Sequence, residues 1–381
     1  MKNKGKAESM AVIICFLLII YGFFIINLLK PADELSASER RRLAQFPEPS
    51  ITSIFNAEFM KGFNDYATDQ AAFRDQWRGL KALFDLKAFG KFDVGGNFII
   101  GDMLFKIEYP LSEGSIIRLC NIINYCDDQY LDGLNVYYTI IPDKNYYLEN
   151  TQYLVLDYDA MADIVRKNVN ADITYIDLYD SLTLDSYFLT DSHWKQEELG
   201  PVIATLSKGL GVKIPFDISK YTQKSYAPFY GVYYGQLGLN VKADEIIYLV
   251  NSTTENAMVT SLEKPGEKLV IYDETELGSM DSYNLFLMGP VAIVTITNPS
   301  SSTGRGLVIF RDSYSSSLAP LLLEGYDTIT LIDLRYLSPE LLGIPELVGD
   351  YVDFTNKDVL FMYSSTIFNN SDSVKNPQIK N

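Results

Sequence analysis

One stretch, Gly304-Arg305-Gly306-Leu307-Val308-Ile309-Phe310-Arg311-Asp312-Ser313-Tyr314-Ser315, joins a glycine-flanked apolar run to an Asp-Ser pair. Such a run predicts a strand of a parallel sheet that is buried on both faces. A serine at its end lies at the carboxyl edge of the sheet, where open α/β sheets bind ligands. The helix or turn that follows offers backbone N–H groups and a positive dipole end, which suit an oxyanion. Asp and Ser are also preferred helix N-caps, and on this stretch alone the cap is favoured.

Strand-like and helix-like segments alternate through the rest of the chain. Short apolar runs predict strands, and apolar positions three and four residues apart predict helices. The predicted strands are 136–141, 173–178, 291–297, 307–310, 328–334 and 358–363, and the predicted helices are 58–86, 113–130, 158–169 and 195–210. This order predicts an α/β fold in which a parallel sheet is flanked by helices on both faces.

Three segments fall outside this alternation. Residues 95–105 predict a hairpin, because the turn signal Gly-Asp separates two apolar runs. Residues 214–288 are rich in Tyr and Gly and predict a β-rich insertion. The residues from 364 onward are polar, so we expect them to fray and assign 366–381 to a C-terminal tail.

The N-terminal part carries a membrane signal. Residues 10–29 contain no charge and would span about 30 Å as a helix, the thickness of a bilayer core. The run ends in Asn-Leu-Leu-Lys-Pro, without the small-residue cleavage site of a signal peptide, so we predict a transmembrane signal anchor; a buried core helix is the alternative. The lysines before the run and the acidic pair after it place residues 1–9 in the cytoplasm and the bulk of the chain outside. Residues 30–60 predict a Pro-punctuated stalk, and 61–365 the extracytoplasmic domain.

Composition excludes several classes of function. The net charge is −17, and no basic patch follows the first residues, which argues against nucleic acid as a partner. One histidine and no cysteine cluster disfavour a metal site. The glycines near residue 95 lack dinucleotide spacing, and no cofactor is expected. Cys120 and Cys126 lie six residues apart in a predicted helix, about 9 Å, so two buried thiols are favoured over a disulfide.

The only histidine, His193, lies in Tyr187-Phe188-Leu189-Thr190-Asp191-Ser192-His193-Trp194. No other side chain has an unperturbed pKa near neutrality, so imidazole chemistry in this chain requires His193. Asp191 and His193 are two residues apart in an extended segment, which places both side chains on one face. A serine needs a base, and an imidazole held by a carboxylate is a good one, so Asp191, His193 and Ser313 are candidates for a triad.

These motifs together carry a family resemblance. The combination of Thr190-Asp191-Ser192-His193-Trp194, Arg311-Asp312-Ser313-Tyr314 and Ile332-Asp333-Leu334-Arg335-Tyr336 resembles the bacterial DHHW family. That family is similar to the SGNH-like O-acetyltransferase domains of the periplasmic alginate acetylation proteins. The family's name motif has a histidine where this chain has Ser192.

The resemblance implies residue roles. Ser313 corresponds to the nucleophile, His193 to the base and Asp191 to the orienting acid. Gly289 and Asn145 are candidates for the oxyanion hole, and Trp194 is a candidate near the substrate. Arg335 either contacts substrate or forms a salt bridge to Asp333 or Asp312.

The resemblance also implies an activity. An SGNH-like domain of this family predicts O-acyl transfer, with acetyl as the acyl group, to a cell-envelope or secreted polysaccharide. Because cytosolic acetyl-CoA is absent outside the cell, a membrane-bound O-acyltransferase is implied as the partner that delivers the acetyl group. An esterase with the same triad is one alternative, and a non-catalytic polysaccharide-binding or scaffold protein on a degenerate fold is the other.

Overall fold

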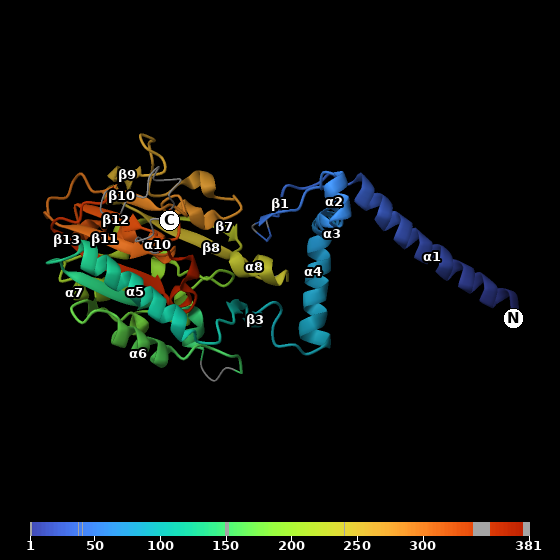
Figure 1. The fold of residues 1–381 in the computed structure, drawn as a ribbon, viewed down its shortest axis with the longest axis horizontal. Coiled ribbons are helices and arrows are strands. Elements are labelled where there is room, and N and C mark those ends of the chain that lie inside the picture. The colour runs from blue at the N-terminus through green and yellow to red at the C-terminus, as the bar shows by residue number, and fades with distance from the viewer. Residues whose placement is uncertain are drawn as a thin grey trace. The chain divides into compact units, whose positions relative to one another are not determined.

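The computed structural model describes residues 2–36, 38–39, 41–148, 152–239, 241–337 and 351–375 (Figure 1). The chain divides into two compact units. The first comprises Met1–Gly95 with Tyr234–Val241, and the second comprises Gly96–Tyr233 with Lys242–Asn381. Residues 376–381 of the predicted tail lie outside the described residues.

The first unit is built from helices. They are α1 (Lys2–Leu29), α2 (Ile51–Phe55), α3 (Glu58–Asp69), α4 (Arg74–Leu83) and a π-helical turn (Phe84–Ala88), and a short antiparallel pair joins β1 (Leu35–Ser36) to β2 (Arg41–Arg42). Ser9–Leu29 of α1 is long and apolar enough to cross a membrane. The single helix predicted over 58–86 is broken between α3 and α4. The break follows Gln70, whose buried amide bonds to the backbone of Asp33 and Ala44, and Phe73 there has a positive φ of 60°.

The second unit is organised around one sheet, which has seven strands within the described residues. The strands are β5 (Val136–Ile141), β6 (Thr174–Tyr175), β9 (Met258–Ser261), β10 (Ile293–Thr297), β11 (Gly306–Arg311), β12 (Thr328–Ile332) and β13 (Lys357–Ser364). Their order is β6-β5-β13-β11-β12-β10-β9. The pairs from β6 to β12 are parallel, as predicted, whereas β10 pairs antiparallel with both β12 and β9. The predicted parallel sheet is thus present from β6 to β12, and the edge formed by β10 and β9 is antiparallel.

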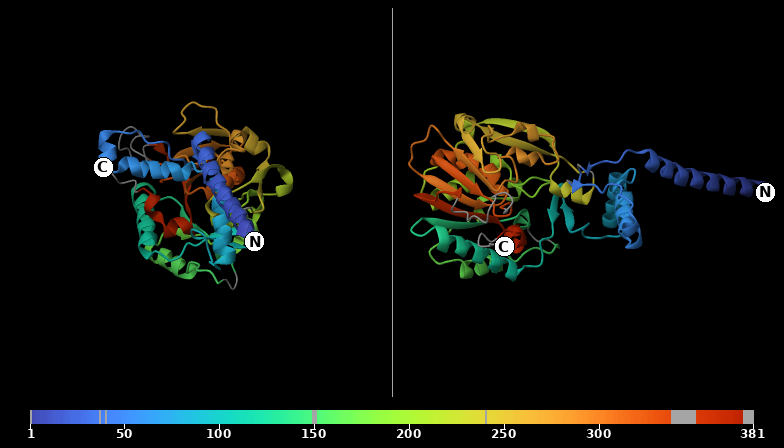
Figure 2. Two further views of the ribbon diagram at one scale, coloured as in Figure 1. Left: turned by 90° about the vertical axis from the view of Figure 1, so that its right-hand side faces the viewer. Right: turned by 45° about the horizontal axis from the view of Figure 1, so that its top comes forward.

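Helices cover both faces of this sheet (Figures 1 and 2). The apolar side chains of α5 (Glu113–Tyr130) and α6 (Tyr158–Asn168) pack in one core cluster with Val308 and Phe310 of β11. Those of α7 (Gly200–Gly209) and α10 (Tyr314–Leu322) pack in another with Leu307 and Ile309. Successive residues of a strand point to opposite faces, so β11 is apolar throughout because both faces are covered. The predicted α/β fold is confirmed.

The remaining elements lie in the connections. The predicted hairpin is confirmed as β3 (Asn97–Ile100) and β4 (Met103–Lys106). The segment predicted to be β-rich holds the antiparallel pair β7 (Thr222–Phe229) and β8 (Asp244–Val250), with α8 (Val232–Leu237) and α9 (Ser252–Asn256). Short 3-10 helices include Lys144–Tyr147, Tyr179–Ser181, Leu184–Ser186, Gln196–Glu198, Ile218–Lys220, Glu274–Glu276, Ser282–Leu285, Leu323–Gly325 and Ser371–Ser373. The helix predicted from 195 thus begins with a separate 3-10 turn, and Pro201 lies in the first turn of α7.

Two predictions about the chain end and the cysteines have clear outcomes. Residues 364–375 do not fray as expected: α13 (Ser365–Asn369) packs beside α5, and Phe368 and Val374 are buried in the core. The Ser115 hydroxyl also bonds to Phe368 O and Ser371 N. Cys120 and Cys126 are buried and unpaired, as the spacing predicted.

Candidate active site

Ser313 lies at the carboxyl edge of the sheet, directly between β11 and α10. The side chain of Asp312 makes the turn: one carboxylate oxygen accepts the Tyr314 N–H at 3.1 Å, and the other accepts the Ser364 N–H at 2.8 Å. Asp312 therefore acts as a cap for α10 and ties it to the end of β13. Ser313 itself makes no side-chain cap bond, which leaves its hydroxyl for other contacts.

The structure brings the three predicted triad residues together. Ser313 Oγ lies 2.7 Å from His193 Nε2, and His193 Nδ1 lies 2.6 Å from Asp191 Oδ1. The His193 side chain is 14% exposed and the Asp191 side chain 1%, so solvent reaches the base but not the carboxylate. With Nδ1–H donating to Asp191, Nε2 carries the lone pair that can accept the Ser313 proton. The predicted geometry of a relay across 120 residues is present.

The Asp191 carboxylate is held from two sides. Oδ1 also accepts the His193 backbone N–H at 3.0 Å, and Oδ2 accepts the Val232 N–H at 2.8 Å. Gly231 approaches so closely that a Cβ there would lie 2.2 Å from Asp191 Cβ. The site therefore needs glycine at 231, because any side chain would displace the carboxylate.

A buried lysine binds the backbone of the loop that carries Asp191 and His193. Lys144, 2% exposed, donates from Nζ to Asp191 O at 2.8 Å and to Phe188 O at 3.0 Å. It also lies against the rings of Phe105 and Tyr233. Burial lowers the pKa of Lys144 to about 7, against the attraction of the Asp191 carboxylate and other nearby acids. Lys144 thus fixes the backbone that presents Asp191.

A buried carboxylate holds the start of the loop. Asp244 accepts the Leu189 N–H at 2.6 Å, and its second oxygen accepts the Thr190 N–H at 2.7 Å and the Thr190 hydroxyl at 2.5 Å. Burial raises the pKa of Asp244, and these donors oppose the shift. The loop between Phe188 and His193 is therefore bound through its backbone at nearly every residue.

Aromatic side chains form the walls beside the base. The ring of Tyr283 stacks on His193 with 3.9 Å between centroids and an interplanar angle of 12°. The Tyr283 hydroxyl is hydrogen-bonded to Ser317 Oγ at 2.9 Å. The Tyr314 hydroxyl donates to Ser192 O at 2.6 Å. These contacts restrict the rotation of the imidazole about its side-chain bonds.

The four residues predicted to contact the substrate or form the oxyanion hole make other contacts in the structure. Trp194 is fully buried and donates from Nε1 to Tyr314 O and Ser317 Oγ, which leaves it no surface for substrate. Arg335 forms a two-point salt bridge to Asp333, at 2.8 and 2.6 Å. Asn145 donates from Nδ2 to Lys106 O, and the Gly289 N–H donates to Phe286 O at 3.2 Å. The Gly289 N–H is therefore already engaged, whereas the Asn145 amide has one further N–H besides the one given to Lys106 O.

Three supporting residues were missed from the sequence: Gly231, Asp244 and Tyr283. All lie in the segment predicted as an insertion, where a chain rich in Tyr and Gly carries no periodic signal. The one available sign was Gly231 itself, a glycine between Tyr230 and Val232 in an aromatic stretch, which is compatible with a close backbone approach.

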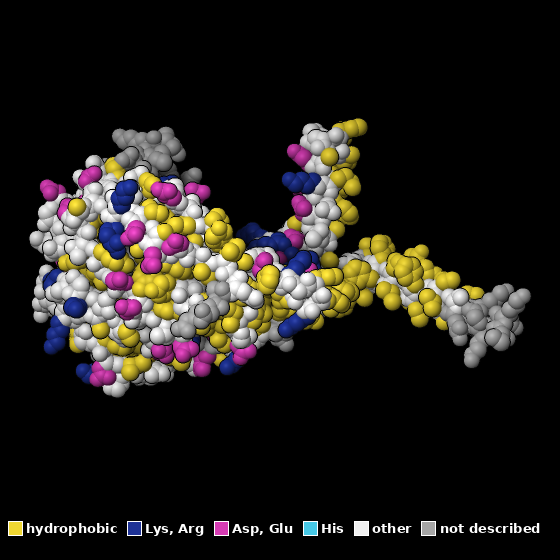
Figure 3. All heavy atoms as spheres, turned by 90° about the horizontal axis from the view of Figure 1, so that it is seen from below, with side chains coloured by type: hydrophobic (Ala, Val, Ile, Leu, Met, Phe, Trp, Pro, Cys, Tyr) yellow, Lys and Arg dark blue, Asp and Glu magenta, His cyan; other side chains and the backbone are white. Residues whose placement is uncertain are grey.

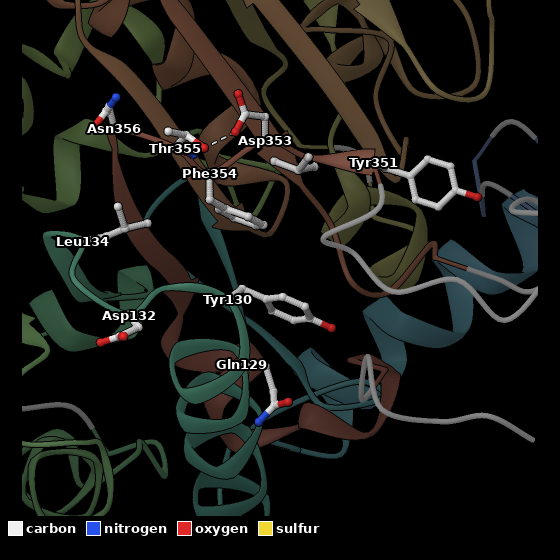
Figure 4. Close-up of a pocket in the computed structure, with 10 residues that line it drawn as sticks. Gln129, Tyr130, Asp132, Leu134, Tyr351, Asp353, Phe354, Thr355 and Asn356 are labelled. Carbon is white, nitrogen blue, oxygen red and sulfur yellow. Dashed lines mark hydrogen bonds between the residues drawn. The ribbon is translucent and has the colours of Figure 1, made fainter.

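A further cavity lies away from Ser313. A pocket of 830 Å³ is lined by the end of α5, the turn after it and the segment before β13 (Figure 4). It lies at the amino end of the parallel strands, opposite the edge that carries Ser313, and the described residues of its lining include no histidine, serine or cysteine. Among the described residues no group of three or more His, Cys, Asp or Glu side chains could hold a metal ion.

Comparison with known proteins identifies the fold. No protein-family model and no curated protein matches the sequence. Among solved structures, a DHHW family protein from Eubacterium siraeum matches with a TM-score of 0.63 and 19% identity, over 74% of this chain and 96% of that chain. Bacillus cereus PatB1, in a structure with a sulfonyl adduct, matches with a TM-score of 0.57 and 19% identity, over 74% and 99%. The O-acetyltransferase domain of Pseudomonas putida AlgJ matches at a TM-score of 0.43 and 13% identity, over 74% and 93%. The predicted resemblance to the DHHW family is confirmed as a shared fold.

Proposed function

We propose that this chain is an O-acyltransferase that moves an acetyl group onto a hydroxyl of a cell-envelope or secreted polysaccharide. The observation that carries the proposal is the continuous relay from Ser313 Oγ through His193 to Asp191, with links of 2.7 and 2.6 Å. The acetyl group and the polysaccharide come from the family resemblance of the sequence motifs.

In the first half-reaction Ser313 is acylated. The Ser313 hydroxyl proton moves to His193 Nε2 while Oγ forms a bond to the acyl carbonyl carbon. The Asp191 carboxylate stabilises the imidazolium. The Ser313 N–H, at the amino end of α10, faces the developing oxyanion together with the helix dipole. The bond to the leaving group then breaks, and the leaving oxygen takes the proton from His193.

In the second half-reaction a sugar hydroxyl accepts the acyl group. His193 Nε2 removes the proton from that hydroxyl, whose oxygen bonds to the acyl carbon. The ester bond to Ser313 breaks, and Oγ takes the proton back from His193. Water in place of the sugar would give the esterase reaction with the same residues.

The N-terminal helix supports a location at the cell membrane. α1 serves as a single-pass anchor with the amino end in the cytoplasm and the second unit outside, as the flanking charges predict. The acyl donor on that side is supplied by a membrane-bound O-acyltransferase, as the resemblance implies. The substrate is a polysaccharide, and neither a nucleic acid nor a cofactor takes part.

Reaction with a sulfonyl fluoride tests the nucleophile. An activated serine displaces fluoride and gains a stable sulfonyl group, which intact-protein mass spectrometry detects. We expect one adduct on the full-length chain in detergent and none on Ser313→Ala. The matched control is Ser252→Ala, an exposed serine at the start of α9, which should be labelled like the native chain. Equal labelling of Ser313→Ala would refute the assignment.

An acyl-donor assay separates transfer from hydrolysis. The full-length chain receives 4-nitrophenyl acetate with or without an acceptor oligosaccharide, and both acetyl-sugar and free acetate are measured. Transfer predicts acetyl-sugar that depends on Ser313. Free acetate at an unchanged rate would favour the esterase, and no Ser313-dependent product with either acceptor would favour the non-catalytic alternative.

A further inference from the structure

The helices of the first unit leave their apolar side chains in the open. α2 and α3 bury none of their residues, and α4 buries only Ala82. Trp77, Leu80 and Phe84 follow each other at spacings of three and four residues, so they share one face of α4 and the turn after it. Trp77 is 53% exposed and Phe84 is 51% exposed. A helix in a globular protein normally covers a face of this kind.

A second apolar face lies on α3. The rings of Phe59, Phe63 and Tyr66 all contact Phe46, with centroids 5.3 to 6.3 Å apart. Phe63 is 39% exposed and Phe46 is 55% exposed, so this aromatic cluster also faces outward. Figure 3 shows apolar side chains along α1 and along one side of α3.

Contacts within the first unit set the position of α4 along the axis of α1. The Ala72 N–H donates to Asn27 Oδ1 at 2.8 Å, and the ring of Trp77 lies edge-on to Phe23 with centroids 6.4 Å apart. Phe23 stands six residues before Leu29, the end of the span, which is about 9 Å along the helix. Amphipathic helices in a membrane interface bury their apolar face to a depth of about 5–10 Å.

The segment around α4 is rich in basic residues, which suits an anionic lipid surface. Residues 74–91 contain five Lys or Arg and two Asp, in a chain of net charge −17. Four of the five are paired: Arg74 and Arg78 with Glu39, at 2.7 and 3.1 Å, and Lys81 and Lys91 with Asp85, at 2.6 and 2.9 Å. Burial of the apolar side chains is therefore the main attraction, and the basic residues, most of them paired, add a smaller affinity for anionic lipid.

We propose that α3, α4 and the turn after α4 lie in the bilayer interface beside the end of α1, with their apolar faces in lipid. The chain then holds the membrane through one spanning helix and one interfacial platform. The platform would hold the first unit against the bilayer surface, whereas a solvated stalk would extend away from it. This inference is independent of the chemistry at Ser313.

Tryptophan fluorescence in proteoliposomes tests the platform. The chain has two tryptophans, and Trp194 is fully buried, so Trp77 is the reporter. The full-length protein is reconstituted in phosphatidylcholine vesicles, with and without phosphatidylglycerol, whose acyl chains carry bromine as a quencher. Because Trp77 lies next to α1, the decisive reporters are Phe63→Trp and Phe84→Trp in a Trp77→Phe background. The control is Thr68→Trp, an exposed position on the opposite face of α3.

We expect bromolipid to quench Trp77 and both introduced tryptophans, with blue-shifted emission, and to leave the Thr68→Trp reporter unquenched. Equal quenching with both lipid compositions shows apolar insertion, and stronger quenching with phosphatidylglycerol shows the basic contribution; both support the platform. Quenching of the Phe63→Trp and Phe84→Trp reporters by aqueous iodide instead of bromolipid would overturn it. Protection of these reporters from both quenchers would also overturn it, because the faces would then be covered by protein such as a second copy.

Discussion

The loop that carries Asp191 and His193 differs from helix α4 in what it buries. Thr190 and Asp191 are fully buried, and their polar atoms bond to Asp244, Gly231 and Val232. α4 exposes its large apolar side chains and buries only Ala82. The second unit therefore uses its interior to fix polar groups, whereas the first unit presents apolar surface to its surroundings.

The contrast has an energetic side. A buried carboxylate or ammonium is costly unless donors and acceptors surround it, and removing one partner costs several kcal/mol. Asp191, Asp244 and Lys144 each have such partners, so the loop is rigid by necessity. An exposed apolar side chain carries no comparable penalty in the folded protein alone. Substitutions in the two regions should thus differ in kind and in size.

The largest effect is expected from Asp191→Asn. The amide keeps the size of the side chain but no longer stabilises the imidazolium or selects the required tautomer, so kcat should fall about 10⁴-fold. Acyl transfer by the purified variant is the measurement, with circular dichroism to show that the fold is kept. A loss smaller than tenfold would mean that Asp191 only caps the loop.

Truncating one phenylalanine in the core and one in the interfacial platform should change stability by very different amounts. Phe310→Ala should lower the free energy of unfolding by about 3–5 kcal/mol, because Phe310 is fully buried between Phe361 and Phe354. Phe84→Ala, at a half-exposed side chain, should change it by about 0.5 kcal/mol or less in detergent. Thermal unfolding of both variants gives the comparison, and similar losses would contradict it.

Gly231→Ala tests how tightly the loop is held. The new Cβ would lie 2.2 Å from Asp191 Cβ, so the carboxylate must shift. A displacement of about 1 Å at the relay should reduce kcat about 10²-fold. The control is Gly133→Ala, where a Cβ meets no neighbouring atom and only the positive φ adds strain. Activity of Gly231→Ala equal to that of the control would show that the loop can adjust.

The buried lysine predicts a pH dependence of stability. Burial lowers the pKa of Lys144 to about 7, from 10.5 in the unfolded chain. Between these values the unfolded chain holds more protons, so the contribution of Lys144 to the free energy of unfolding rises with pH, by at most about 1.4 kcal/mol per unit. The stability difference between the native chain and Lys144→Met should therefore grow from pH 7 to pH 10. The exposed Lys208→Met is the control, and parallel curves would mean that Lys144 titrates normally.

The smallest effect is expected from Tyr283→Phe. The ring still stacks on His193, but the hydrogen bond to Ser317 at 2.9 Å is lost. Stability should fall by about 1 kcal/mol, with kcat changed by less than tenfold. Thermal unfolding and the acyl-donor assay check this, and a large loss of kcat would show that the hydroxyl itself takes part in the reaction.

Local patterns were enough to predict the centre of the fold. β11 reads directly as an apolar run because both of its faces are covered, and the single histidine limited the choice of base to one residue. The position of Ser313 after that strand predicted its place at the carboxyl edge of the sheet, where the structure has it. Each of these inferences depends on a few neighbouring residues.

Features that depend on distant contacts could not be predicted in this way. β10 is as apolar as its parallel neighbours, and only its pairing with β12 sets its direction. Residues 364–375 are polar in sequence, but the hydroxyls of Ser115 and Ser371 bond to each other's backbone and hold the segment against α5. Gly231 and Asp244 act through backbone contacts made 40 or more residues away.

The order of the sheet has a consequence for how the chain matures. β13, the last strand, pairs between β5 and β11 at the middle of the sheet, and the Ser364 N–H holds the carboxylate beside Ser313. While the chain is being synthesised, β5 and β11 have no partner between them until residue 364 has emerged. The proposed site at Ser313 is therefore incomplete in any chain that ends before β13, and the proposed acyl transfer would require residues up to Ser364 to be in place.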